Sequence, residues 1–362
     1  MTKFVESFAT HQLLPPWVSK GARTWGFVVR VSEDCIRRYL DQYFNGGGED
    51  RAPFEYSALP GPQFGLVGVA LHPNISSRFP GRPAGWDTLS QIEVYWTYPV
   101  LRRRITEDNL LVDPHIVWVE PFEFSNNASA VFSSREIWGT ETEYATIVHD
   151  ESSGPDQLHV DVAIDGIKTF NPRSYSQLLA CMHIRTGGLS QIELADILKG
   201  KPDLEGFAGI LGASGLFAGQ GPPAPIKGGA PTGVELNNLK QFRDCANMGQ
   251  AIYRAIVASR SWHTDIDNIV IYDAAKVEVD FMWSDSIGEM MTTVLGVEPL
   301  LIEGMRPTAE GPPTGHGARE ASDDPHAIDW DLQRVPVEVE LAFAFSSNVE
   351  FEVLSTLHTY AG

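Results

Sequence analysis

The chain has 362 residues, of which 43% are hydrophobic and 20% charged, the composition of a globular protein with a substantial core and not of a disordered chain. Its formal net charge of −20 would repel nucleic-acid backbones and anionic membranes, so we expect neither as a partner. Three cysteines without metal-ligand spacing, and an N-terminus without a basic start and a long apolar run, predict a cytoplasmic protein with no disulfide framework, zinc site or membrane span.

Strand-like segments dominate the sequence. In chain order they are residues 25–31, 65–71, 92–97, 116–124, 159–164, 269–271, 277–283 and 335–345. Apolar and polar residues alternate in several of them, which predicts sheets with one face in water. Helices are expected at residues 33–44, 174–181, 191–199 and 286–295. This balance predicts an α+β fold with an antiparallel sheet or β-barrel and a few flanking helices, not alternating βα units.

Two segments rich in Gly and Pro interrupt this pattern, at residues 209–233 and 303–330. Neither can hold a regular helix or strand for long, so each is expected to be a surface loop or a lid over a site. We therefore expect a domain of residues 1–300 that contains the first insertion, an acidic linker or lid at 301–334, and C-terminal strands at 335–362 that join the same domain.

The segment at residues 131–145 carries the most specific signal. It reads Val-Phe-Ser-Ser-Arg-Glu-Ile-Trp-Gly-Thr-Glu-Thr-Glu-Tyr-Ala and resembles the active-site segment of acetoacetate decarboxylases through Arg135 and Glu136. In that family two lysines follow, the first forming a Schiff base with the keto substrate while the second lowers its pKa. Those two positions are Thr142 and Glu143 here, and neither side chain can form an imine.

Two further segments are similar to the same family. Residues 27–40 resemble its first strand and helix, with Ser32 as the expected helix N-cap, and residues 239–281 resemble its late strands. The resemblance implies curved sheets that close into a cone-like barrel around the active site, in a homo-oligomer. It also implies that the covalent electron sink is absent from its usual place.

The resemblance gives Arg135 and Glu136 as candidate catalytic residues, because the family's Arg-Glu pair helps build the floor of the substrate cavity. Glu141 and Glu143 alternate on an extended chain and would share one face, with Thr142 opposite. If that face lines the cavity, the two carboxylates would raise one pKa and provide a general acid-base group. The alternatives are a structural ion pair for Arg135 and Glu136 and a solvated surface for the two other glutamates.

Candidate substrate-binding residues come from the same segment and from the strands that precede it. Alternation places Trp118, Glu120 and Phe122 on one face that faces either the pocket or an aromatic core. Arg23 lies within one position of a substrate-binding arginine of the family. The full candidate set is Arg23, Trp118, Glu120, Trp138, Thr142 and Tyr144.

Metal and nucleotide sites are not expected. The pairs His149-Asp150 and His159-x-Asp161 lack the spacing of common zinc sites and are interpreted as polar loop and strand residues. The glycine-rich run at residues 212–219 lacks the strand and the later acid of a dinucleotide-binding turn. We therefore expect no cofactor.

The resulting hypothesis is a small-molecule enzyme of specialised metabolism that carries out a lyase, isomerase or cyclase step on a β-keto or polyketide-like compound without a Schiff base. One alternative is a non-catalytic binding or structural protein. Another is a decarboxylase that uses a relocated lysine, namely Lys168, Lys240 or Lys276.

Overall fold

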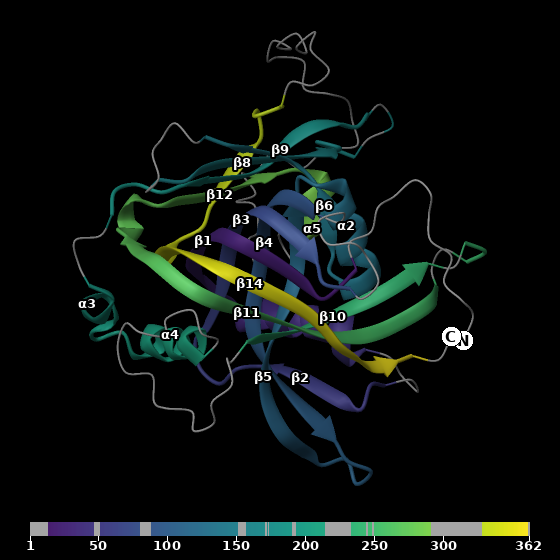
Figure 1. Cartoon of the computed structure of the whole chain (residues 1–362). Helices are drawn as coiled ribbons and strands as arrows, with labels where there is room; N and C mark the ends of the chain where they lie inside the picture. Colours follow the sequence, from purple (N-terminus) through teal and green to yellow (C-terminus); the bar gives the residue numbers. More distant parts are fainter. Residues whose placement is uncertain are drawn as a thin grey trace.

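The structure is a computed structural model. It describes residues 14–46, 51–79, 88–150, 157–170, 172, 174–189, 193–213, 233–243, 245–247, 250–290 and 328–360. Two sheets account for most of these residues (Figure 1). None of the described helices is long and apolar enough to cross a membrane.

The main sheet has nine strands in the order β2-β4-β3-β1-β14-β11-β10-β5-β6. They are β1 (Trp17–Val31), β2 (Phe54–Ala58), β3 (Gln63–Ser77), β4 (Thr88–Ile105), β5 (Leu111–Ser125), β6 (Thr142–Tyr144), β10 (Val234–Arg243), β11 (Ala251–Tyr272) and β14 (Val339–Thr359). Because β4 also pairs with β5, the strands β4, β3, β1, β14, β11, β10 and β5 form a closed circuit.

The predicted antiparallel pairing holds for most of this sheet, but β5 runs parallel to β10 and to β6. The main sheet is therefore mixed.

The second sheet has five strands in the order β13-β12-β9-β8-β7 and lies across one side of the main sheet (Figure 1). Its strands are β7 (Thr146–His149), β8 (His159–Gly166), β9 (Gln177–Arg185), β12 (Glu278–Trp283) and β13 (Gln333–Pro336). The largest core cluster fills the space between the sheets, where the Phe281 ring lies 6.2 Å from Trp96 and 6.4 Å from Phe122.

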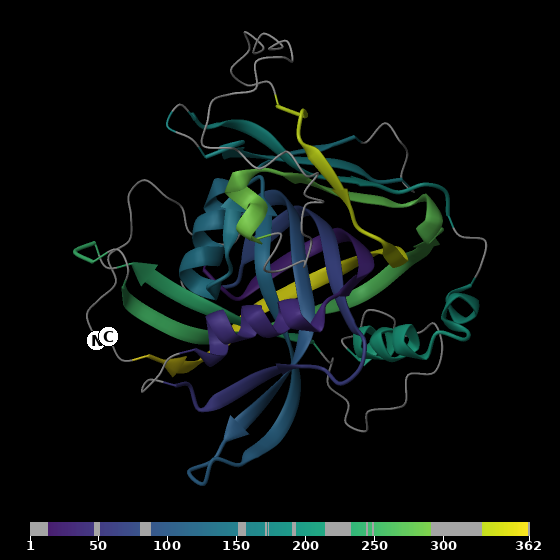
Figure 2. The ribbon, with the colours of Figure 1, turned by 180° about the vertical axis from the view of Figure 1, so that it is seen from behind.

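Short helices cover the sheets (Figure 2). They are α1 (Glu33–Leu40), α2 (Ala128–Ser133), α3 (Leu194–Leu198), α4 (Pro202–Ala213), α5 (Asp285–Met290), the π-helical turns η1 (Asp41–Asn45) and η3 (Ser134–Trp138), and the 3-10 turn η5 (Ala274–Lys276). The apolar face of α1 packs on the main sheet through Ile36 and Leu40. Ser32 does occupy the N-cap position, but its side chain makes no capping hydrogen bond.

Two predicted elements are wrong. Residues 174–181 were expected to be helical, but Gln177–Arg185 is the strand β9. Both faces of its apolar run are buried. In such a run polar residues do not recur at a regular spacing, so the sequence pattern alone cannot distinguish a strand from a helix. Residues 335–345 were expected to form one strand, but the chain changes sheets between β13 and β14.

Two other element predictions hold in part. The helix expected at 191–199 is only Leu194–Leu198, and the expected insertion at 209–233 begins within α4. Residues 214–232 and most of the segment 303–330 lie outside the described residues, as does the second half of the helix expected at 286–295.

Candidate active site

A cavity of about 140 Å³ is lined by side chains from all seven strands of the closed circuit. Residues of η3 and Leu211 of α4 complete its wall. An engineered protein cavity of roughly 150 Å³ holds a benzene molecule, so this one has room for a small ring or a short carbon chain.

Two glycines make the room for the aromatic part of this wall. Tyr95, Gly68, Gly26 and Phe343 are consecutive cross-strand partners on β4, β3, β1 and β14. A Cβ atom on Gly68 would lie 2.1 Å from the Tyr95 ring, and one on Gly26 would lie 2.3 Å from the Phe343 ring. Each ring therefore lies flat over a glycine of the neighbouring strand, and a larger residue there would displace it.

Three glutamates, Glu93, Glu120 and Glu123, line the same cavity. Glu120 and Glu123 are three residues apart on β5, so simple alternation would place them on opposite faces. The register between β4 and β5 shifts at this point: Tyr98 pairs with Val119 but Trp96 pairs with Phe122. This bulge inserts one extra residue in β5 and turns both carboxyl groups toward the cavity. Pro121, which has no N–H to donate to a ladder, lies within it.

Burial raises the pKa of two of these carboxyl groups, Glu120 and Glu123. Desolvation, followed by the charge of Glu93, raises the pKa of Glu120 from 4.5 to about 8. Desolvation also raises the pKa of Glu123 well above its usual value, with Glu93 and Glu120 adding to the effect. A hydrogen bond of 2.8 Å from Thr142 Oγ1 to Glu123 Oε2 opposes it. The raised pKa favours the neutral, protonated form of Glu120 near pH 7.

Glu123 Oε1 has no hydrogen-bond donor among the described residues. The closeness of the Glu93 side chain adds to the raised pKa of Glu123. The cavity thus holds two carboxyl groups with raised pKa values, Glu120 and Glu123.

Two histidines flank the glutamates. His72 lies between Ser19 and Glu93, with its Nδ1 2.8 Å from Ser19 Oγ and its Nε2 3.2 Å from Glu93 Oε2. His263 Nδ1 lies 2.8 Å from Ser347 Oγ. Desolvation, followed by the charge of His72, lowers the pKa of His263 to about 4, so this ring is neutral at pH 7.

Much of the rest of the wall is apolar and aromatic, and its other polar residues are Thr24, Thr97, Ser134, Thr140, Asn238, Ser259, Arg260 and Ser261. Trp17, Trp138 and Phe351 form a cluster in which the two tryptophan rings meet edge to face at 4.9 Å. Other large apolar residues of the wall are Leu66, Trp118, Leu211, Leu236, Phe343 and Phe345. A ligand in the cavity would therefore contact a carboxyl cluster and an apolar surface together.

The charged residues of the 131–145 motif do not line this cavity. The π-helical turn η3 directs Ser134 and Trp138 into the wall, and Thr140 follows them. Arg135 is exposed and pairs with Glu143 at 3.3 Å. Glu136 is half-buried, and its charge partly offsets the lowering of the Lys240 pKa that burial causes.

Glu141 and Glu143 share one face of the chain, as their alternation predicts, but that face lines a second, open cleft of about 670 Å³ together with Tyr144. Desolvation raises the pKa of Glu141, while Arg135 lowers it and Glu143 raises it further. The residue between the two glutamates, Thr142, is the one that points inward and holds Glu123.

Of the predicted binding residues, Trp118 and Glu120 line the cavity, but Phe122 lies on the opposite face because of the bulge. Arg23 also lies outside the cavity, where its guanidinium stacks on Trp25 at 4.8 Å. Its neighbours Thr24 and Gly26 face inward.

Site residues outside the predicted set include His72, Glu93, Tyr95, Glu123 and His263. Glutamates within an aromatic strand were the one available signal for Glu93 and Glu123, because a charged residue is costly in a buried strand unless it has a partner or a role. The histidines carry no such signal, since they are far from the glutamates in sequence.

No protein-family model matches this sequence, and no curated protein does. Among solved structures, the chain is similar to acetoacetate decarboxylase from Legionella pneumophila, at 9% identity, a TM-score of 0.48 and coverage of 94% of this chain and 88% of that chain. It is also similar to the enduracididine biosynthesis enzyme MppR in complex with a condensation product of pyruvate and imidazole 4-carboxaldehyde, at 12% identity, a TM-score of 0.47 and coverage of 94% and 90%.

A third similar structure is an acetoacetate decarboxylase-like enzyme from Sphingomonas wittichii, at 8% identity, a TM-score of 0.44 and coverage of 97% and 100%. Two of these three proteins bear the name of the family that residues 131–145 resemble. Identities and TM-scores are low, so the chemistry of this cavity has to be inferred from its own residues.

Proposed function

We propose that this protein is a small-molecule enzyme that transfers protons on a carbonyl compound, in a lyase, isomerase or cyclase step that needs no Schiff base. One observation carries the proposal: Glu120 shares a small cavity with Glu93 and Glu123, where burial and the charge of Glu93 raise its pKa to about 8. Two carboxyl groups with separated protonation states are the usual equipment for combined acid and base catalysis.

In the proposed reaction Glu120 donates a hydrogen bond to the carbonyl oxygen of the substrate. Because burial keeps this acid neutral at pH 7, it stabilises the negative charge that develops on that oxygen when an enolate forms. Glu93, in contact with His72, accepts the proton from the neighbouring carbon. Thr142 holds Glu123 in place beside them.

The cavity also supports a choice of substrate class. As the proposed base, Glu93 would repel an anion, and Arg260 is the one Lys or Arg side chain among the described residues that line the cavity. The aromatic and aliphatic wall favours an apolar body. The substrate proposed is therefore a neutral β-keto or polyketide-like compound of a few carbon atoms, or a segment of a larger one.

A relocated lysine is the second candidate, and Lys240 is the residue that favours it. It follows Asn238 on the same face of β10, beyond the lined cavity, and partial burial lowers its pKa while Glu136 raises it. Lys168 and Lys276 are held instead in ion pairs with Asp329 and Asp273. Borohydride trapping with a keto acid, followed by peptide mapping, would find an adduct on Lys240 if this alternative holds.

The test uses methyl acetoacetate, a neutral β-keto ester, and acetoacetate, its anionic counterpart. Exchange of the α-protons with deuterium from solvent is followed by NMR at pH 7 with and without protein. We expect the protein to accelerate exchange of the ester more than that of the acid, and Glu120→Gln to reduce the acceleration by about 100-fold or more. Glu33→Gln, on the exposed start of α1, is the matched control and should have no effect.

Two results would contradict the proposal. If the ester binds but its exchange is no faster than in buffer, the protein is a binding protein for such compounds. If Glu120→Gln accelerates exchange of the ester's α-protons as much as the unmodified protein does, then a group other than Glu120 is the catalytic acid.

A further inference from the structure

A group of metal-ligand side chains lies on the second sheet, away from the cavity. On β8 and β9 the alternate residues Val160, Val162 and Ile184 are buried in the core, so His159, Asp161 and His183 project from the other face. Asp161 and His183 are direct cross-strand partners. The sheet itself therefore brings these three side chains together, although they are up to 24 residues apart in sequence.

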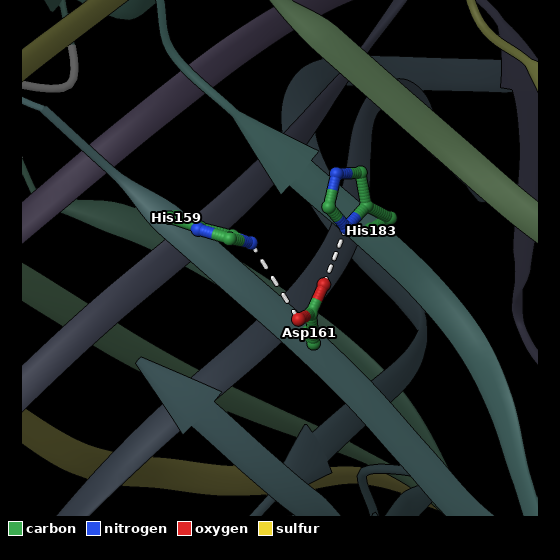
Figure 3. A group of neighbouring side chains, drawn as sticks. All are labelled: His159, Asp161 and His183. Carbon is green, nitrogen blue, oxygen red and sulfur yellow. Dashed lines mark hydrogen bonds and ion pairs between the residues drawn. The ribbon is translucent and has the colours of Figure 1, made fainter. Parts of the chain in front are cut away.

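Figure 3 shows the Asp161 carboxylate between the two imidazole rings. Its Oδ2 lies 3.5 Å from His159 Nε2, and its Oδ1 makes a short hydrogen bond with His183 Nδ1. One ligand atom from each residue lies within 4.8 Å of the other two. Among the described residues, no other group of His, Cys, Asp and Glu meets this condition.

We propose that His159, Asp161 and His183 bind a divalent transition-metal ion, with Zn²⁺ as the fitting representative. Zinc binds imidazole nitrogen and carboxylate oxygen at about 2.0–2.2 Å, so neighbouring ligand atoms of a tetrahedral site lie roughly 3.4 Å apart. The 3.5 Å separation of His159 Nε2 and Asp161 Oδ2 already has this value, and His183 needs only to move slightly away from the carboxylate. Three protein ligands leave the fourth position to water.

The surroundings of the three ligands support a cation. The second nitrogen of His159, Nδ1, lies 3.9 Å from Asp150 Oδ2. A carboxylate on the far nitrogen of a ligand histidine is the common arrangement around zinc, where it fixes the ring and increases its basicity. Asp280, the cross-strand partner of His183 on β12, adds another buried carboxylate and pairs with Arg334 at 3.3 Å.

One neighbour opposes metal binding. Arg185, the cross-strand partner of His159, places its Nε and Nη2 at 3.2 Å and 3.1 Å from His159 Nε2. Its guanidinium donates to the lone pair that the metal would take, so it must swing away when the ion binds. Because Arg185 is exposed, this movement costs little. The geometry thus gives a prediction of opposite sign: removing Arg185 should strengthen metal binding.

The experiment measures Zn²⁺ binding to the full chain, first stripped with a chelator, by calorimetry at pH 7.5, with Co²⁺ absorption spectra to report the ligand set. We expect one site per chain and a Tm that rises with Zn²⁺. Asp161→Asn and His159→Ala should each weaken binding by about 100-fold or more, and Arg185→Gln should strengthen it. His115→Ala removes an exposed histidine of β5 and is the matched control.

The proposal is overturned if Zn²⁺ does not bind with a dissociation constant below millimolar, or if it binds equally well to Asp161→Asn, His159→Ala and the control. His159 is half-exposed and its replacement should leave the core intact, so a folded variant is available even if Asp161→Asn does not fold. No substrate is needed for these measurements, so their outcome is independent of the proposed enzymatic activity.

Discussion

Replacing Glu120 with glutamine should change the pH dependence of stability in a defined direction. The pKa of Glu120 is 4.5 in its usual state and about 8 in the folded protein, so between these values the folded chain holds a proton that the unfolded chain has released. Stability from this group is therefore present in full below pH 4.5 and is lost as pH rises through 8, with a slope of about 1.4 kcal/mol per pH unit.

Integration from about pH 5 to pH 8 gives a loss of roughly 3.5 kcal/mol for the isolated group. Because the side chain faces a cavity that admits water, we expect on the order of 2 kcal/mol. Glutamine cannot ionise, so Glu120→Gln should gain this amount relative to the unmodified protein over the same range.

The assay is urea unfolding of both proteins at pH 5, 6, 7 and 8, with Glu33→Gln as the exposed control. Stability differences between Glu120→Gln and the unmodified protein should grow steadily with pH, while the control should follow the unmodified protein. If the stability of Glu120→Gln and of the unmodified protein changed in parallel with pH, this carboxyl group would ionise normally. Glu120 could then not be the proposed acid.

Other perturbations should give results of different sign and size. Gly68→Ala should destabilise the protein by about 1–3 kcal/mol, because the new methyl group meets Tyr95, whereas Gly206→Ala, in a helix with nothing within 4 Å, should be neutral or stabilising. Urea unfolding would measure the stability of both variants, and their binding of methyl acetoacetate would be measured as well. His263 has its folded pKa lowered to about 4, so its stability contribution is full above pH 6.5 and is lost as pH falls toward 4; His263→Gln should remove that acid-side loss, and an unchanged acid limb would contradict it. A double-mutant cycle of Arg135→Gln and Glu143→Gln should give a coupling energy below about 1 kcal/mol, since both side chains are exposed; a larger value would indicate a buried, functional pair.

The strand at 277–283 was predictable because apolar and polar residues alternate from Val277 to Asp280, and alternation is a direct consequence of strand geometry. The prediction failed at 174–181, where both faces of β9 are covered and alternation disappears. Which strands meet could not be read from local pattern, and the closure of β4 on β5 depends on pairings between distant segments.

The site was predictable only in part for the same reason. Trp118 and Glu120 follow from alternation on β5, and Trp138 and Thr142 from the motif, and these four reach the cavity or its glutamates. The pairing of Glu120 with Glu123 depends on the bulge at Pro121, which strict alternation excludes. The catalytic roles predicted for Arg135, Glu136, Glu141 and Glu143 remain predictions, and the structure places all four outside the cavity.

The most direct test of the central claim is the pH profile of kcat/KM for deuterium exchange into methyl acetoacetate. A neutral Glu120 acid predicts exchange that is fast at pH 7 and declines on the alkaline side with a pKa near 8, and Glu120→Gln should lose both the rate and this limb. An alkaline limb that persists unchanged in Glu120→Gln would show that another group supplies the proton, and the account of the cavity would be wrong.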